Sequence, residues 1–267
     1  IASAMSSAII PGVAASYVKG TVAQTRKQVT RAIQMTMLIA IPAAVGIAVL
    51  PRPIMQFIFP QKESLDIASG LLAALAVTVV FYSLSTLTNA VLQGIGKVNT
   101  PVIHAVVALV IQVAGLIALL LYTDLELYAL AAANAIYSFV MCVLNHLSVR
   151  KHLEYRMDVV KLFLKPLFSA VIMGAAVFGV YHGLILLIPV SRLVLLIAIA
   201  IGVCVYGAVL LLVGGVSREE LQAFPRGYTL VHIAERLHLL SDESEGTEKR
   251  KKRRRKKKRR KKRRASL

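Results

Sequence analysis

The sequence predicts an all-α polytopic membrane protein. Three observations support that fold class: the apolar composition, the long charge-free runs, and the alternation of charge between those runs. Of the 267 residues, 57% are hydrophobic, and the mean hydropathy is +0.69. A soluble domain of this size would not need so much apolar surface to fill one core. We therefore expect lipid to surround much of the chain.

Six charge-free apolar runs are long enough to cross a membrane as helices, which takes roughly 20 mostly apolar residues. Each run must be helical, because an open strand would leave its backbone polar groups unpaired in lipid. The runs cover residues 32–51, 67–96, 98–123, 127–149, 166–191 and 193–217. A seventh run, residues 1–18, begins at Ile1 rather than at a Met and lacks the pattern of a signal peptide. We expect it to be a truncated membrane helix, with an N-terminal part of the protein missing.

Charge in the connecting links predicts which side of the membrane each link occupies. The first, third and fifth links and the tail are basic, whereas the fourth link is acidic, with Asp124 and Glu126. The basic residues are Lys19, Arg26, Lys27 and Arg31 in the first link, Lys97 in the third, and Arg150, Lys151, Arg156, Lys161 and Lys165 in the fifth. By the positive-inside rule these three links and the C-terminus lie in the cytoplasm.

The net charge of +19 comes mostly from the end of the chain. Residues 249–264 hold 16 of the 32 Lys and Arg, which leaves 16 elsewhere against 13 Asp and Glu. Three interpretations of this run stay open: contact with anionic lipid headgroups, contact with nucleic acid, or a solvated low-complexity tail. The residues we single out for contact with anionic lipid or another polyanion are Lys249, Arg250, Lys251 and Lys252. No aromatic residue interrupts the run, so we expect no specific nucleic-acid recognition.

Proline and capping residues indicate where helices bend, begin and end. Pro42 lies in the middle of the first complete span, where its missing hydrogen bond predicts a kink or hinge. After the last span, Ser217 and Glu220 have the spacing of a capping box, and Pro225 ends a first short helix. Residues 218–240 are predicted to form an amphipathic segment on the cytoplasmic interface. Residues 241–267 are predicted to be a disordered tail, acidic first and then rich in Lys and Arg.

Polar residues inside two of the spans recur at helical spacing and so share one helix face. Tyr82, Thr86, Asn89 and Gln93 form one stripe, and Asn134, Ser138, Met141 and Asn145 form the other. Polar groups at membrane depth face protein or water rather than lipid. The stripes therefore indicate either hydrogen bonds between helices or the wall of a water-filled transport cavity. Our candidates for a cavity wall are Asn89, Gln93, Gln112, Asn134 and Asn145, with His104 as weaker support.

The chain lacks the residue patterns of an enzyme or a metal site. No Asp, Glu, Lys or Arg lies well inside a complete span, although a proton relay or ion-coupled site usually needs one. The histidines show no metal-ligand spacing, and Cys142 and Cys204 both lie in apolar runs, where a thiol behaves as a small hydrophobe. We expect no metal, no cofactor, no disulfide and no catalytic activity.

Several phrases resemble a known transporter family. SAMSSAIIPGVAASYVKG, IAIPAAVGIAVLPRPIMQFIF and VLQGIGKVNTPV resemble the C-terminal half of polysaccharide flippases in the multidrug/oligosaccharidyl-lipid/polysaccharide exporter (MATE-like) superfamily. VLNHLSVRKHLEYRMDVVKLFLKPLFSAVIMG and GGVSREELQAFPRG are similar to its stage V sporulation protein B branch, which is related to MurJ-type lipid II flippases. The resemblance covers residues 1 to about 240.

The resemblance implies a fold and a function. Residues 1–18 would match the eighth helix of a fourteen-helix flippase, residues 32–149 would hold four helices of its C-terminal lobe, and residues 160–217 two extra helices that form a groove for a lipid tail. The implied function is movement of a lipid-linked saccharide, such as a cell-wall or spore-cortex precursor, across the bacterial cytoplasmic membrane by alternating access. The expected partners are the bilayer and that substrate. A cation-coupled multidrug antiporter of the same superfamily is the alternative, and a membrane-embedded glycan transferase ranks last.

Overall fold

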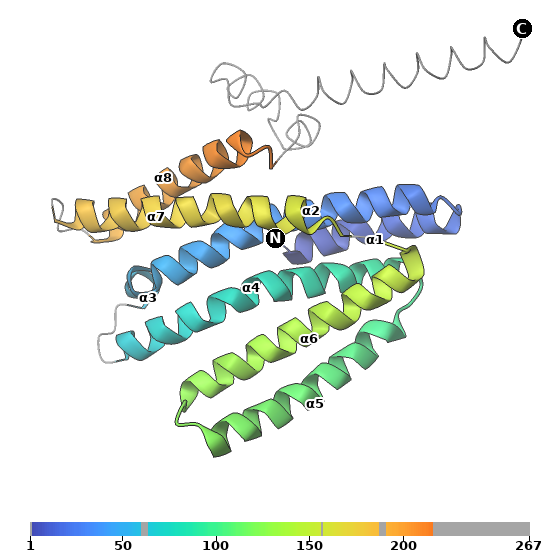
Figure 1. Ribbon diagram of the computed structural model, residues 1–267, viewed down its shortest axis with the longest axis horizontal. Helices are drawn as coiled ribbons and strands as arrows, with labels where there is room; N and C mark the ends of the chain where they lie inside the picture. Colours follow the sequence, from blue (N-terminus) through green and yellow to red (C-terminus); the bar gives the residue numbers. More distant parts are fainter. Residues whose placement is uncertain (1, 60–63, 156, 187–190, 216–267) are drawn as a thin grey trace, which may run out of the picture. The chain divides into compact units, whose positions relative to one another are not determined.

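The computed structural model describes residues 2–59, 64–155, 157–186 and 191–215, and the regular structure in these ranges is helical (Figure 1). The elements are α1 (Ala2–Val18), α2 (Val22–Val49), α3 (Pro51–Ile58), α4 (Leu65–Gly94), α5 (Asn99–Tyr122), α6 (Leu127–Leu153), the π-helical turn η1 (Val160–Leu164), α7 (Lys165–Ile185) and α8 (Ser191–Leu212). The predicted capping box at Ser217 and Glu220, the segment 218–240 and the tail 241–267, with Lys249 to Lys252, lie outside the described residues.

The predicted fold class is confirmed: the chain is an all-α, multi-pass membrane protein. Among the described residues, six helical stretches are long and apolar enough to cross a membrane. They are α2, α4, α5, α6, the continuous stretch Val160–Ile185, and Arg192–Leu212 within α8. The apolar helix α1 is shorter. These six stretches coincide in order with the six runs that the sequence predicts.

The structure differs from the sequence prediction where a helix extends beyond its charge-free run. Helix α2 begins at Val22, so most of the basic first link is helical rather than an open connection. Charged residues set where the hydrocarbon ends, but they do not end a helix, since a solvated helix can carry them on any face. The short helix α3 was not predicted either, although Pro51 at its first position suits a helix start. Helix α2 runs through Pro42 without a break, and the predicted kink there stays a prediction.

Helices α2 and α4 form the centre of the part comprising residues 1–206. Helix α2 packs against α1, α4 and α7, and α4 also packs against α1 and α6 (Figure 1). The core between them is apolar and fully buried, with Ile33 and Met37 from α2 and Leu87 from α4. Helix α5 lies against α6. These contacts place α4, α5 and α6 next to one another, which decides where their polar residues can meet.

A second apolar cluster joins α7 to the first half of α8. Met173, Val177 and Tyr181 of α7 pack with Val194 and Ala198 of α8. A Cβ atom added at Gly202 would lie 2.5 Å from the Val177 side chain, so only glycine permits this close approach. The residues after Tyr206 group separately, and their described portion, residues 207–215, completes α8 and the turn that follows it.

Contacts between the links show that consecutive helices alternate in direction. Arg26, near the start of α2, donates to the carbonyl of Leu153 at the end of α6, so the first and fifth links share one end. A Cβ atom added at Gly94, where α4 ends, would lie 3.0 Å from the Val13 side chain in α1, which places the third link there too. We call this end, with residues 19–31, 95–98, 150–155 and 157–165, the basic end. The sequence assigns all of it to one side of the membrane.

Candidate functional site

Asn145 is the centre of a polar cluster that joins three membrane helices. It lies in α6, and its side chain is fully buried. Its amide nitrogen Nδ2 donates to Asn89 Oδ1 in α4 at 2.7 Å and to the Ser85 carbonyl oxygen at 3.3 Å. Its Oδ1 lies 2.8 Å from Nδ1 of His104 in α5. The interior amide of α6 therefore contacts both neighbouring helices.

The donors and acceptors of this cluster determine the tautomer of His104. Because Asn145 uses Nδ2 as a donor, its Oδ1 must accept, so the proton of a neutral His104 is on Nδ1. His104 Nε2 then accepts from the Ser148 hydroxyl, 3.3 Å away. We call Asn89, His104, Asn145 and Ser148 the polar network. In this arrangement the amide of Asn145 and both ring nitrogens of His104 have hydrogen-bond partners, which is what a low-dielectric interior requires.

The structure divides the five predicted cavity residues into two groups. Asn89 and Asn145 meet in the polar network. Gln93 on α4 and Asn134 on α6 are exposed, and Gln112 on α5 is half-buried. No hydrogen bond of these three side chains to another described residue is present. Since polar groups at membrane depth face protein or water, these three amides are free to contact something other than this part of the chain.

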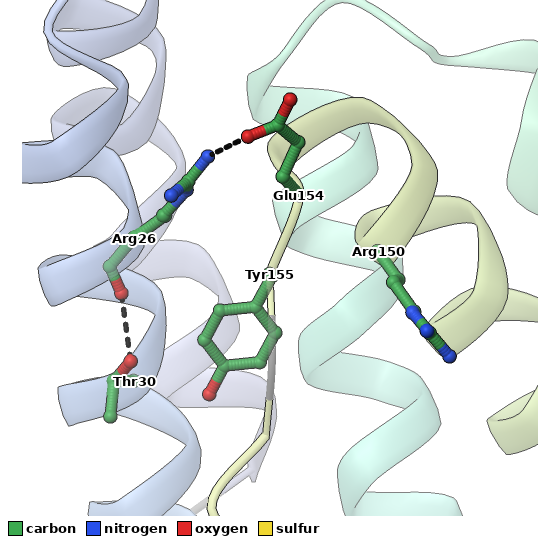
Figure 2. Close-up of a pocket in the computed structure, with 5 residues that line it drawn as sticks. All are labelled: Arg26, Thr30, Arg150, Glu154 and Tyr155. Carbon is green, nitrogen blue, oxygen red and sulfur yellow. Dashed lines mark hydrogen bonds and ion pairs between the residues drawn. The ribbon is translucent and has the colours of Figure 1, made fainter.

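A pocket at the basic end was not predicted from the sequence. Its volume is about 670 Å³, and Figure 2 shows the residues that line it: Arg26, Thr30, Arg150, Glu154 and Tyr155. They come from the start of α2 and from the end of α6 with the residues that follow it. The sequence placed both arginines in basic links, but no pattern in it brings together residues 128 positions apart.

Arg26 is held in the pocket by two interactions with the end of α6. Its Nε donates to the Leu153 carbonyl oxygen, and its Nη2 forms an ion pair with Glu154 Oε2 at 2.8 Å. Glu154 itself has a φ of 45°, in the left-handed region that non-glycine residues rarely adopt. Arg26 therefore has a defined position, although it is partly exposed.

Tyr155 forms a neutral floor for this pocket. Its side chain is 3% exposed, and this burial is the main reason that the pKa of its phenol is raised. The charge of Asp158 raises the phenol pKa further, whereas the Thr30 hydroxyl lowers it. The Thr30 hydroxyl donates to the Arg26 carbonyl oxygen, and no partner in the described residues has hydrogen-bond geometry to the phenol. The phenol adds no negative charge near neutral pH.

No group of three or more His, Cys, Asp or Glu side chains in the described residues could hold a metal ion. Cys142 and Cys204 are free thiols, one buried and one exposed. The chemistry available in the described helices is therefore that of amides, hydroxyls and the imidazoles of His104, His146 and His182 within the apolar runs, and of guanidinium groups at their edge. Such groups bind and orient polar ligands.

Comparison with known proteins decides the family. The family described as "Lipid II flippase MurJ" matches residues 1–184, more than half of the chain. The chain belongs to the MurJ lipid II flippase family. A curated relative, lipid II flippase MurJ of Bacillus subtilis (strain 168), is 29% identical over 185 residues, which cover 66% of this chain and 32% of the relative. The chain thus spans about a third of the length of that MurJ protein.

The MurJ match confirms the predicted flippase family and leaves the narrower prediction of its branch untested. The sporulation branch of the resemblance stays a prediction, because the match is to the MurJ family as a whole. The matched range ends at residue 184, next to the last residue of α7. The polar network and the pocket both lie within the matched range, whereas α8 lies beyond it.

Proposed function

We propose that this chain is part of a flippase that moves a lipid-linked saccharide, such as lipid II, from the cytoplasmic to the outer leaflet of a bacterial cytoplasmic membrane. The observation that carries the proposal is the MurJ family match over residues 1–184. The neutral polar interior of α4, α5 and α6 supports it, because a transporter needs polar groups at membrane depth. The protein would act as a transporter rather than an enzyme.

In this proposal the described helices form the C-terminal lobe of a two-lobe, MATE-like transporter that works by alternating access. The basic end would face the cytoplasm, as the positive-inside rule requires, and the C-terminus would follow it there. Residues 160–217 would supply two further helices for the lipid tail. Their apolar exposed side chains support that role, among them Phe168, Val171 and Phe178 on α7 and Leu193, Leu196 and Val203 on α8.

Three amides, two exposed and one half-buried, are our candidates for the wall of the substrate cavity. Asn134, Gln93 and Gln112 have no partner among the described residues, so each can donate to and accept from a saccharide or its phosphates. Asn145 has both ends of its amide occupied, so we assign it a positioning role, in which it orients Asn89. Asn89 shares its Oδ1 with Asn145 and keeps its own amide nitrogen for the substrate.

The test is translocation of a labelled lipid-linked disaccharide by the complete protein in proteoliposomes. Replacing both exposed amides, Asn134→Leu with Gln93→Leu, should lower the translocation rate about tenfold, which corresponds to about 1.4 kcal/mol of lost hydrogen bonding. Membrane abundance should not change, because neither side chain holds another helix. Leu130→Ile is the matched control, since Leu130 is exposed one turn before Asn134 on the same helix.

The variant Asn145→Leu tests the positioning role of Asn145 separately from substrate binding by the other amides. It should lower thermal stability together with translocation, because it removes the hydrogen bonds between α6 and its two neighbours. An unchanged translocation rate in the Asn134→Leu, Gln93→Leu double variant would contradict the cavity assignment. Export of cationic drugs without movement of the disaccharide would contradict the flippase proposal itself.

A further inference from the structure

The pocket at the basic end has the charge and shape of an anion site. Two of its five lining residues are arginines and one is Glu154, so the lining carries a net positive charge. In the view of Figure 2, the Arg26 and Arg150 side chains lie on opposite sides of Tyr155. Both arginines line the pocket, so a ligand in it would contact side chains that carry guanidinium groups. A volume of about 670 Å³ accommodates a small polar headgroup.

Both arginines retain donors that the protein does not use. Arg26 donates from Nε to the Leu153 carbonyl oxygen and from Nη2 to the Glu154 carboxylate. Within the described ranges its Nη1 has no acceptor. Arg150 forms no ion pair with a described residue, although Glu154 is only one helical turn away. The planar fork of a guanidinium group matches the oxygens of a phosphate and binds them through two parallel hydrogen bonds.

The position of the pocket indicates which phosphate groups can reach it. Arg150 follows the apolar run 127–149 directly, and Thr30 lies just before the apolar run 32–51. The pocket therefore lies where two membrane helices leave the hydrocarbon, at the depth of lipid headgroups. There a Lys or Arg side chain gains about 1 kcal/mol from an anionic surface.

We propose that this pocket binds the phosphate group of an anionic membrane lipid at the basic end of the bundle. The inference goes beyond the proposed transport function, because the ligand is a resident lipid rather than the transported substrate. Arg150 supplies the free guanidinium group. Arg26, fixed by Glu154 and Leu153, supplies the second. Glu154 limits the affinity, because its carboxylate competes with the phosphate for Arg26.

The experiment places the complete protein in nanodiscs of phosphatidylcholine with phosphatidylglycerol and counts retained phosphatidylglycerol by native mass spectrometry after gentle release. Arg150→Gln should weaken retention about tenfold, the loss expected for a charge-assisted hydrogen bond. Glu154→Gln should strengthen retention, because it removes the competing carboxylate. The full chain, with residues 249–264, is kept in every variant, so that any contribution of the tail is common to all of them.

Lys97→Gln is the matched control, because Lys97 is exposed at the basic end and does not line the pocket. It should leave phosphatidylglycerol retention unchanged. Equal retention in Arg150→Gln and Lys97→Gln would overturn the proposal. Displacement of phosphatidylglycerol by soluble pyrophosphate would overturn the assignment of the phosphate to a lipid. Translocation measured in the same variants keeps this result distinct from the transport test, since we expect Arg150→Gln to retain transport.

Discussion

Helices α2 and α5 are both membrane spans, yet their surroundings differ. Over the most apolar stretch of each helix, half of the residues of α2 are buried, against 6% of those of α5. Helix α5 is nevertheless the more hydrophobic, with a mean hydropathy of 2.6 against 2.0. Helix α2 packs against α1, α4 and α7, whereas α5 packs mainly against α6.

The difference shows that hydropathy alone does not decide which of these two helices is buried. Between helices in a bilayer there is little hydrophobic driving force, so association depends on close packing and on hydrogen bonds. Helix α2 uses close packing, with a fully buried face. Helix α5 uses His104, which joins the polar network, and leaves most of its surface to lipid or to parts of the protein outside this chain.

The largest expected difference between the two helices is in the effect of shortening a side chain. Ile33→Ala in α2 should lower the free energy of unfolding by about 2–4 kcal/mol, because Ile33 is fully buried and a cavity would remain. Val110→Ala in α5, where Val110 is 63% exposed, should change it by less than about 0.5 kcal/mol. Unfolding by sodium dodecyl sulfate in mixed micelles of the complete protein measures both. An equal cost for Val110→Ala would show that another part of the protein covers α5.

The next effect concerns glycine contacts. A Cβ atom added at Gly174 in α7 would lie 2.9 Å from the Val45 side chain of α2, so Gly174→Ala should cost about 1–3 kcal/mol through overpacking. In α5, the nearest atom to a Cβ added at Gly115 is Ile136 Cδ1 at 3.4 Å, an ordinary contact. Gly115→Ala should be neutral or stabilising, because alanine favours the helix. Thermal unfolding of the two variants makes the comparison, and equal melting temperatures would contradict it.

Removing the polar attachment of α5 should have a smaller effect. His104→Leu removes the bonds to Asn145 and Ser148, and hydrogen bonds between membrane helices contribute about 0.6 kcal/mol on average and about 1.7 at most. Gln112→Leu on the same helix should cost nothing measurable, because Gln112 has no partner among the described residues. Proteolysis of the link between α4 and α5 reports the difference, since loosening α5 exposes that link. Equal cleavage of the two variants would show that the polar network does not hold α5.

The smallest effect at neutral pH is expected beside α2, at Tyr155. Burial raises the phenol pKa above its usual value of 10.0, so the folded state favours the neutral form. This stabilisation is complete below pH 10 and is lost as the pH rises through the raised pKa. Tyr155→Phe should therefore match the unsubstituted protein near neutral pH and melt at a higher temperature than it above pH 10. Parallel melting curves at alkaline pH would contradict this.

The sequence was sufficient to predict the membrane helices, because the absence of charge over a long apolar run has one structural explanation in lipid. It was less informative about their ends. The basic residues Arg26 and Arg31 predict a membrane boundary, but α2 continues past them to Val22. The short helix α3 was not predicted, and Pro51 occupies its first position, where proline is tolerated.

The polar network was predicted only in part, because the sequence gives helix faces but not the contacts between helices. Helical spacing placed Asn89 and Asn145 on defined faces of their own helices, and hydrogen bonding between helices was one of the two alternatives left open. The spacing within one helix carries no information about rotation against a neighbour, so the contribution of Ser148 was not foreseen. Nothing local to the sequence relates Arg26 to Glu154, because their contact depends on the packing of α2 against the end of α6.

The length of the apolar part of α2 can be compared with the thickness of the bilayer. Its apolar part, residues 32–49, would be about 27 Å long at about 1.5 Å per residue, slightly less than the roughly 30 Å of a typical hydrocarbon core. Helices α2 and α4 are packed together, so hydrophobic mismatch in a thicker membrane cannot be relieved by sliding α2 alone. The membrane would have to thin locally, or Arg31 would have to extend towards the headgroups. The apolar part of α2 is thus the shorter of the two that the packed pair α2 and α4 must fit into one bilayer.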